Sequence, residues 1–201
     1  MLPEYFAIIG AIIASLGGLY YFYETLTGKA KPNRVTWLLW GLFPMITFVA
    51  QRAQGVEGVS WLTFAAGFTP FLIVAASFIN KKAYWKTEPR DYVLMAVAII
   101  GILAWLITDE PNLAILLTLL ADLFAGIPTL IKAYKHPQTE SWVAYAVSTL
   151  GFGIGVLAIQ TLDFQILSRL QRTVLLVLGC RVIIRVLTIP SIITARLMAN
   201  S

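Results

Sequence analysis

The sequence has few of the residues that build catalytic or metal centres. It contains one cysteine, Cys180, and one histidine, His136, among 201 residues. A disulfide framework and a multi-cysteine metal site are therefore excluded, and a histidine-based metal centre is not expected. The sequence also contains no recognisable serine–histidine–acid set and no paired catalytic carboxylates. We therefore predict neither an enzymatic activity nor a cofactor.

Charged side chains are scarce as well. They make up 12% of the chain, whereas 59% of the residues are hydrophobic. A soluble domain carries about 25% charged and about 45–50% apolar residues. So little charge cannot cover a water-facing surface, which excludes a soluble globular enzyme and a disordered chain. The composition predicts an integral membrane protein, with the lipid bilayer as its surroundings.

Seven apolar stretches run along the chain, separated by short segments that contain Gly, Pro and charged residues. They cover residues 5–26, 35–51, 59–79, 92–108, 112–131, 142–160 and 166–194. A helix needs about 20 residues to cross a bilayer, so we predict an all-α protein with seven transmembrane helices. The last stretch contains Arg181 and Arg185, which are costly at the membrane centre. It therefore either spans the membrane with its arginines near one face or lies partly along the surface.

Lysine and arginine gather in alternate loops, which fall on one predicted side of the membrane. That side holds Lys29, Lys31, Arg34, Lys81, Lys82, Lys86, Arg90, Lys132, Lys135 and Arg196, and the other holds Arg52, Arg169 and Arg172. Basic loops stay in the cytoplasm, so we predict an inner-membrane protein with its N-terminus outside and its C-terminus in the cytoplasm. This topology accounts for the net charge of +5, and no nucleic-acid partner is predicted.

Two segments share a pattern at a constant offset of 105 residues, namely residues 31–40 and 136–145. Each has a basic residue, Pro and an amide side chain, followed by a hydroxyl residue, Trp and a second aromatic residue. The match predicts two three-helix repeats, 1–80 and 110–201, joined by a cytoplasmic loop and a linker helix over 81–109. Parallel repeats of this kind are related by an axis along the membrane normal, and carriers built from repeats bind substrate between them near the midplane.

This three-plus-one-plus-three plan resembles the SWEET sugar transporters and the wider PQ-loop membrane proteins. Pro128 and Thr129 occupy the positions of the family's Pro-Gln pair, and Pro44 matches a proline of its second repeat helix. The family's substrate-binding asparagines are missing, because neither 59–79 nor 166–194 contains an asparagine. The resemblance implies a carrier that moves a sugar or a similar small polar solute by alternating access. Two alternatives stay open: a vitamin-precursor carrier of the nicotinamide riboside type, and a non-transporting membrane interaction protein.

Four aromatic residues at helical spacing are candidates for binding the solute. Trp37 and Trp40 form one i, i+3 pair, and Trp142 and Tyr145 form another, so each pair shares a helix face. Flat rings suit stacking on a sugar or a nicotinamide ring. The alternative is an aromatic belt at the membrane surface, which suits Trp37 and Trp142 better than the two deeper residues.

Asp122 is the candidate with the strongest polar character, because it lies near the middle of the fifth stretch. An acid inside a membrane is costly and is a functional candidate by default, although a structural contact with another helix is the alternative. It would accept hydrogen bonds from the solute or titrate during transport. Thr69, Ser148 and Thr149 are further candidates for lining the site.

Pro44 and Pro128 interrupt apolar helices and are candidate hinges, with simple tolerance in a membrane helix as the alternative. Gly151, Gly153 and Gly155 are not a phosphate loop, because no strand precedes them, and they predict close helix packing. The sequence leaves the coupling ion and any homo-oligomer open.

Overall fold

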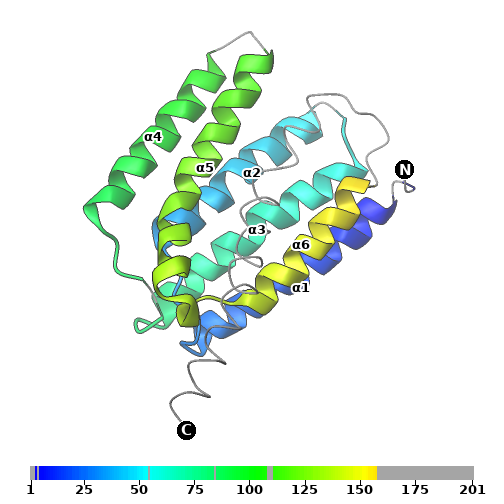
Figure 1. Ribbon diagram of the computed structural model, residues 1–201. Helices are drawn as coiled ribbons and strands as arrows, with labels where there is room; N and C mark the ends of the chain where they lie inside the picture. Colours follow the sequence, from blue (N-terminus) through cyan, green and yellow to red (C-terminus); the bar gives the residue numbers. More distant parts are fainter. Residues whose placement is uncertain (1–2, 4, 54, 84, 108–110, 158–201) are drawn as a thin grey trace, which may run out of the picture.

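The structure, a computed structural model, describes residues 3, 5–53, 55–83, 85–107 and 111–157. The side chains of a few of these residues, including Asp122, are outside the description. Within it the chain forms helices and no strand. The elements are α1 (Tyr5–Leu26), α2 (Arg34–Ala53), α3 (Gly58–Ile79), α4 (Pro89–Leu106), α5 (Pro111–Lys135), the short 3-10 helix η1 (Pro137–Thr139) and α6 (Trp142–Leu157) (Figure 1).

The predicted all-α class is confirmed, and each of the first six apolar stretches corresponds to one helix. Local signals set several of the ends. Pro89 and Pro111 begin α4 and α5, where a missing N–H costs nothing. The predicted seventh helix, 166–194, lies outside the described residues, so the seven-helix arrangement stays a prediction.

In the described part of the chain, two helices are long and apolar enough to cross a membrane, Tyr5–Leu26 and Ser60–Ile79. The outer face of α1 agrees with a lipid environment, because large apolar side chains such as Ile12 and Leu16 are exposed there. An extended exposed apolar surface is unfavourable in water. These features support a membrane location and leave the orientation open.

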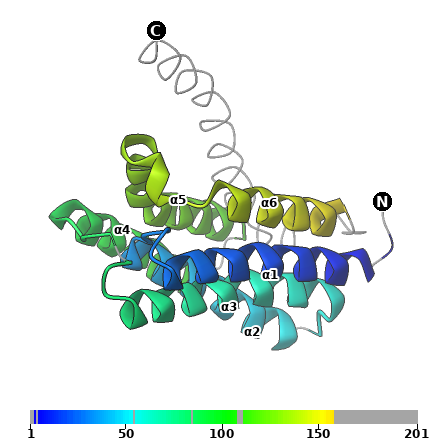
Figure 2. The ribbon, with the colours of Figure 1, turned by 90° about the horizontal axis from the view of Figure 1, so that it is seen from below.

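The helices form two groups, α1, α2, α3 and α6 in one and α4 and α5 in the other, which meet at α2. α3 packs between α1 and α2, α6 packs along α1, and α4 packs along α5, which also reaches α2. Figure 2 shows α6 and α5 on one side of α1, with α3 and α2 on the other. The close contact between α1 and α6 depends on small residues: a Cβ on Gly10 would lie 2.5 Å from the carbonyl oxygen of Gly151. Small residues at a helix interface let the backbones approach this closely.

One end of the bundle carries the three links between α1 and α2, α3 and α4, and α5 and α6 (Figure 1). The basic residues of the sequence pattern, such as Lys29, Lys81 and Lys135, lie at this end, which we call the basic end. Asn33 organises it, because its side-chain oxygen accepts hydrogen bonds from the backbone N–H groups of Val35 and Thr36 and so caps α2. Its amide nitrogen donates to buried Asp91 at the start of α4, at 2.9 Å.

Candidate functional site

A pocket with a free volume of about 50 Å³ lies among α1, α2, α3 and α6. Aromatic and small side chains supply most of its lining. The aromatic residues are Tyr21, Trp37, Trp40, Tyr145 and Phe152, and the small ones are Ala14, Gly17, Gly18, Ala66 and Ala144. Thr69, Pro70 and Ser148 complete it. Among the described residues, therefore, no charged side chain lines the pocket.

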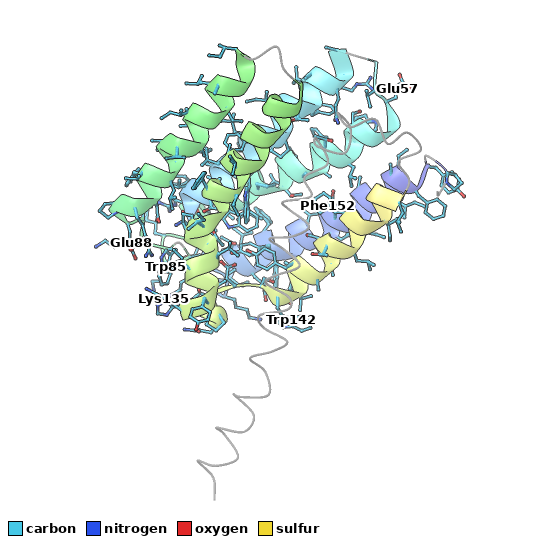
Figure 3. All side chains as sticks on the ribbon, turned by 45° about the horizontal axis from the view of Figure 1, so that its top comes forward. Glu57, Trp85, Glu88, Lys135, Trp142 and Phe152 are labelled. Atoms are coloured by element: carbon cyan, nitrogen blue, oxygen red, sulfur yellow. The ribbon has the colours of Figure 1, made fainter. Side chains whose placement is uncertain are left out.

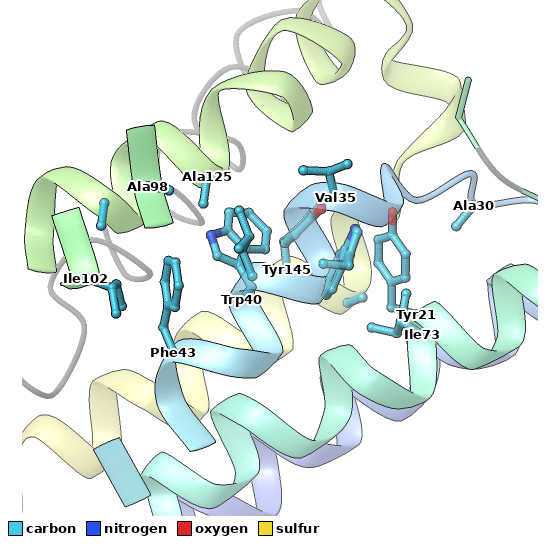
Figure 4. Close-up of a cluster of buried hydrophobic side chains, with 14 residues drawn as sticks. Tyr21, Ala30, Val35, Trp40, Phe43, Ile73, Ala98, Ile102, Ala125 and Tyr145 are labelled. Atoms are coloured by element: carbon cyan, nitrogen blue, oxygen red, sulfur yellow. The ribbon is translucent and has the colours of Figure 1, made fainter. Parts of the chain in front are cut away.

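Trp37 is at the centre of the aromatic part. Its ring centroid lies 4.5 Å from that of Tyr21, 5.5 Å from that of Trp40 and 6.4 Å from that of Tyr145. The Trp37–Trp40 contact is edge-to-face and the Trp37–Tyr145 contact is stacked, both favourable ring geometries. Figure 4 shows Tyr21, Trp40 and Tyr145 converging from α1, α2 and α6. The rings fix one another's positions, which provides a preformed surface for a flat solute.

Each hydroxyl group of the pocket already donates a hydrogen bond to an oxygen of the protein. Tyr21 donates to Glu140 Oε2 at 2.7 Å, and Tyr145 donates to the same oxygen at 2.9 Å. Thr69 donates to a backbone carbonyl of its own helix, and Ser148 donates to the carbonyl oxygen of Ala14. What these groups can still offer a solute is their oxygen lone pairs.

The indole nitrogen of Trp37 differs from these hydroxyls. Trp37 is 6% exposed, and its Nε1–H has no hydrogen-bond acceptor among the described residues. A buried donor without a partner is costly, and the surface of this nitrogen is closed to solvent in the present structure.

A buried ion pair lies next to the two tyrosines, towards the basic end. Lys132 Nζ is 2.9 Å from Glu140 Oε1, and the two side chains are 1% and 5% exposed. Lys132 also donates to the carbonyl oxygen of Lys31. Lys132, Glu140, Tyr21 and Tyr145 therefore connect α5, the η1–α6 junction, α1 and α6, and we call these four side chains the tyrosine–carboxylate network.

Glu140, Lys132 and Tyr21 were not among the site residues predicted from the sequence. Glu140 stood at a variable position of the repeat pattern, and Lys132 was counted with the basic loops. The available signal was an acid directly before a helix and a lysine in the last turn of the preceding one. Tyr21 and Glu140 are 119 residues apart, so nothing local indicates their contact.

Five predicted site residues come together in the pocket: Trp37, Trp40, Thr69, Tyr145 and Ser148. Their role in binding stays a prediction. Trp37 is buried inside the bundle, so the aromatic-belt interpretation does not describe it.

Trp142 does not line the pocket. It is 52% exposed at the start of α6, and Figure 3 shows it at the basic end near Lys135. Its place fits an aromatic belt better than a binding site. Thr149 is also absent from the lining, although its hydroxyl is buried without a hydrogen-bond partner in the described part of the chain.

Asp122 is part of α5, but its side chain lies outside the described residues, so its assignment stays a prediction. Pro44 and Pro128 are buried within α2 and α5, which is compatible with either a hinge or simple packing. Pro70, within α3, lines the pocket.

The two predicted segments can be compared by their helix starts. α2 follows its cap Asn33, and α6 follows Ser141, whose hydroxyl accepts a hydrogen bond from the N–H of Ala144. Counted from these starts, Trp37 corresponds to Tyr145, and their backbone N–H groups bond to the carbonyl oxygens of Asn33 and Ser141. The sequence offset of 105 instead pairs Trp37 with Trp142, because η1 occupies the link before α6. The repeat itself stays a prediction.

The described residues contain no group of three or more His, Cys, Asp or Glu side chains that would hold a metal ion. Comparison with protein-family models, curated proteins and solved structures finds no match to this chain. The resemblance to the SWEET and PQ-loop proteins therefore stays a prediction.

Proposed function

We propose that the protein is a small-solute carrier of the inner membrane and that the aromatic pocket is its binding site. The observation that carries the proposal is the pocket itself: a ring-lined, uncharged space among helices, with a buried polar network at one end of it. Pockets of this composition, with a few placed polar groups, are typical of small-molecule sites.

The packing supports two halves related by an axis along the membrane normal. α1 packs against α6, and α2 packs against α5. An axis that exchanges α1 with α5 and α2 with α6 exchanges these two contacts with each other. In this proposal α4 is the linker helix, the seventh apolar stretch completes the second repeat, and the pocket lies between the repeats, as in carriers of this type.

The tyrosine–carboxylate network serves as the gate at the basic end in this proposal. Tyr21 and Tyr145 line the pocket and also donate to Glu140, so a path from the pocket to the basic end requires these bonds to break. The present state is then closed on the basic side, which we assign to the cytoplasm because basic loops stay there. Rocking of the halves, with Pro44 and Pro128 as hinges, would open it.

A sugar or a similar polar metabolite is the first substrate class that the SWEET-like plan suggests, with Trp37 and Trp40 stacking on its ring. A nicotinamide riboside-type precursor is the second, because its flat ring suits the same two indoles.

Counterflow in proteoliposomes tests the proposal without assuming a coupling ion. Vesicles preloaded with unlabelled glucose, sucrose or nicotinamide riboside are diluted into the corresponding labelled solute. The proposal predicts transient accumulation of at least one label. Folded protein that accumulates none of them would remove these substrates and favour the non-transporting alternative.

A further inference from the structure

We propose that the pocket selects compact organic cations, with a quaternary or ring-delocalised charge, over neutral polyols of similar size. The inference rests on the proposed function only in taking the pocket as a solute site, and it names the chemical class of the solute.

The first argument is the arrangement of the rings. Tyr21, Trp37, Trp40 and Tyr145 form a connected cluster from three helices, with centroid separations between 4.5 and 6.4 Å. Several aromatic faces around one space are the known means of binding quaternary ammonium groups, because the π-faces carry negative electrostatic potential. Tryptophan gives the strongest such contact, and this pocket contains two tryptophans.

The second argument is the direction of the hydrogen bonds. Four hydroxyls donate hydrogen bonds to protein oxygens, those of Tyr21, Tyr145, Thr69 and Ser148. These hydroxyls can therefore only accept hydrogen bonds from a solute, through their oxygen lone pairs. Two phenols that donate to one carboxylate are polarised further towards negative oxygen. The surface is therefore electron-rich, which favours positive charge and disfavours anions.

The third argument concerns the nearby ammonium group. Lys132 lies beyond the tyrosines and is held by Glu140 and by the carbonyl oxygen of Lys31. Its charge is therefore compensated, and it does not line the pocket. A cation in the pocket meets no uncompensated positive charge from the described side chains.

Neutral polyols fit this lining poorly. Each hydroxyl of a sugar needs an acceptor for its proton and a donor for its oxygen. The uncommitted donor that the described residues offer is the Nε1–H of Trp37. Most sugar oxygens would lose water without replacement, which is unfavourable. A movement of the rings that uncovers this N–H would bring it to a cation that carries one oxygen close to its charge, as choline does.

The test is calorimetric titration of the full-length protein in detergent with choline, tetramethylammonium, glucose and the neutral isostere of choline, in which a tert-butyl group replaces the trimethylammonium. We expect both cations to bind and the neutral isostere to bind about tenfold or more weakly. Equal or tighter binding of the isostere or of glucose would overturn the inference, as would no binding of either cation to folded protein.

Three variants locate the site. Trp40→Ala should weaken both cations about tenfold or more, because it removes one π-face. Trp61→Ala is the matched control, since Trp61 is half exposed on α3 and does not line the pocket. Trp37→Phe keeps a ring but removes the N–H, so it should weaken choline more than tetramethylammonium. If Trp40→Ala does not fold, Trp37→Phe decides: unchanged relative affinities would contradict the assigned role of Trp37.

Binding and transport separate the two claims. Choline binding without counterflow of choline or any tested solute would contradict the carrier and leave the cation site standing. Counterflow of glucose without choline binding would contradict the cation preference and leave the carrier standing.

Discussion

At the residue scale, Glu140 joins the aromatic pocket to a buried ion pair. It accepts hydrogen bonds from two pocket tyrosines through one oxygen and pairs with Lys132 through the other. Because all these groups are buried, each one depends on the others for its polar contacts. A solute that moves either ring would therefore also disturb the ion pair.

A double-mutant cycle tests this dependence. Glu140→Gln leaves Lys132 buried without its counter-charge. Lys132→Met likewise leaves the Glu140 carboxylate buried without its counter-charge. We expect each single variant to lose about 3–5 kcal/mol of unfolding free energy. The double variant should recover a large part of that loss, because no uncompensated charge remains. Unfolding in mixed detergent measures all four proteins, and losses that simply add would contradict a coupled pair.

The tyrosine–carboxylate network also shows why contacts between individual side chains were difficult to predict from the sequence. Trp37, Trp40, Thr69, Tyr145 and Ser148 were found because helical spacing and residue type are local properties. The contact between Tyr21 and Glu140 spans 119 residues and exists only once α1 and α6 have packed together. No periodicity in either segment encodes it.

At the scale of the elements, the contact between α1 and α6 holds the pocket together. Gly10, Gly17 and Gly151 bring the two backbones together where any larger residue would meet main-chain atoms. Tyr21 and Tyr145 can then approach to a ring separation of 5.7 Å. The packing of these small residues therefore determines the width of the pocket.

Two glycines of α6 provide a matched comparison. A Cβ on Gly151 would meet the backbone of Gly10 and Ala14, whereas a Cβ on Gly153 would have no atom within 4 Å. Gly151→Ala should therefore cost about 1–3 kcal/mol of stability, because the helices must separate. Gly153→Ala should be neutral or gain about 0.5–1 kcal/mol, since alanine favours the helix. Thermal unfolding of both variants checks this, and equal effects would argue against close packing at Gly151.

Helix positions were largely predictable from the sequence, because apolar runs and the Pro and Gly residues that end them are local signals. The start of α6 relative to its link was less predictable. η1 adds a 3-10 turn before α6 that the link before α2 lacks, so helix starts pair Trp37 with Tyr145, whereas residue type pairs it with Trp142. Whether a helix begins at once or after a 3-10 turn depends on packing of the link, which the pattern does not contain.

At the scale of the whole molecule, the charge distribution predicts the orientation. The links at the basic end carry most of the lysines, whereas the basic residue nearest to the link between α2 and α3 is Arg52, in the last turn of α2. By the positive-inside rule we expect the basic end to face the cytoplasm, and this orientation stays a prediction.

Single cysteines test this orientation in a Cys180→Ser background. Lys81→Cys and Arg52→Cys replace exposed residues at opposite ends of the bundle. A membrane-impermeant maleimide is added to intact cells, or to spheroplasts if an outer membrane blocks it. The reagent should label Arg52→Cys. It should leave Lys81→Cys unlabelled until the membrane is opened. The reverse pattern would place the basic end outside and invert the proposed gate.

The measurement that tests the central claim most directly is counterflow by wild-type protein, Trp40→Ala and Trp61→Ala reconstituted at equal amounts, with choline, glucose and nicotinamide riboside as labelled solutes. A carrier that uses the aromatic pocket predicts accumulation by the wild type and by Trp61→Ala, and about a tenfold or greater loss in Trp40→Ala. Accumulation that is equal in all three proteins would contradict the assignment of the pocket. No accumulation by folded wild-type protein would contradict the carrier for these solutes.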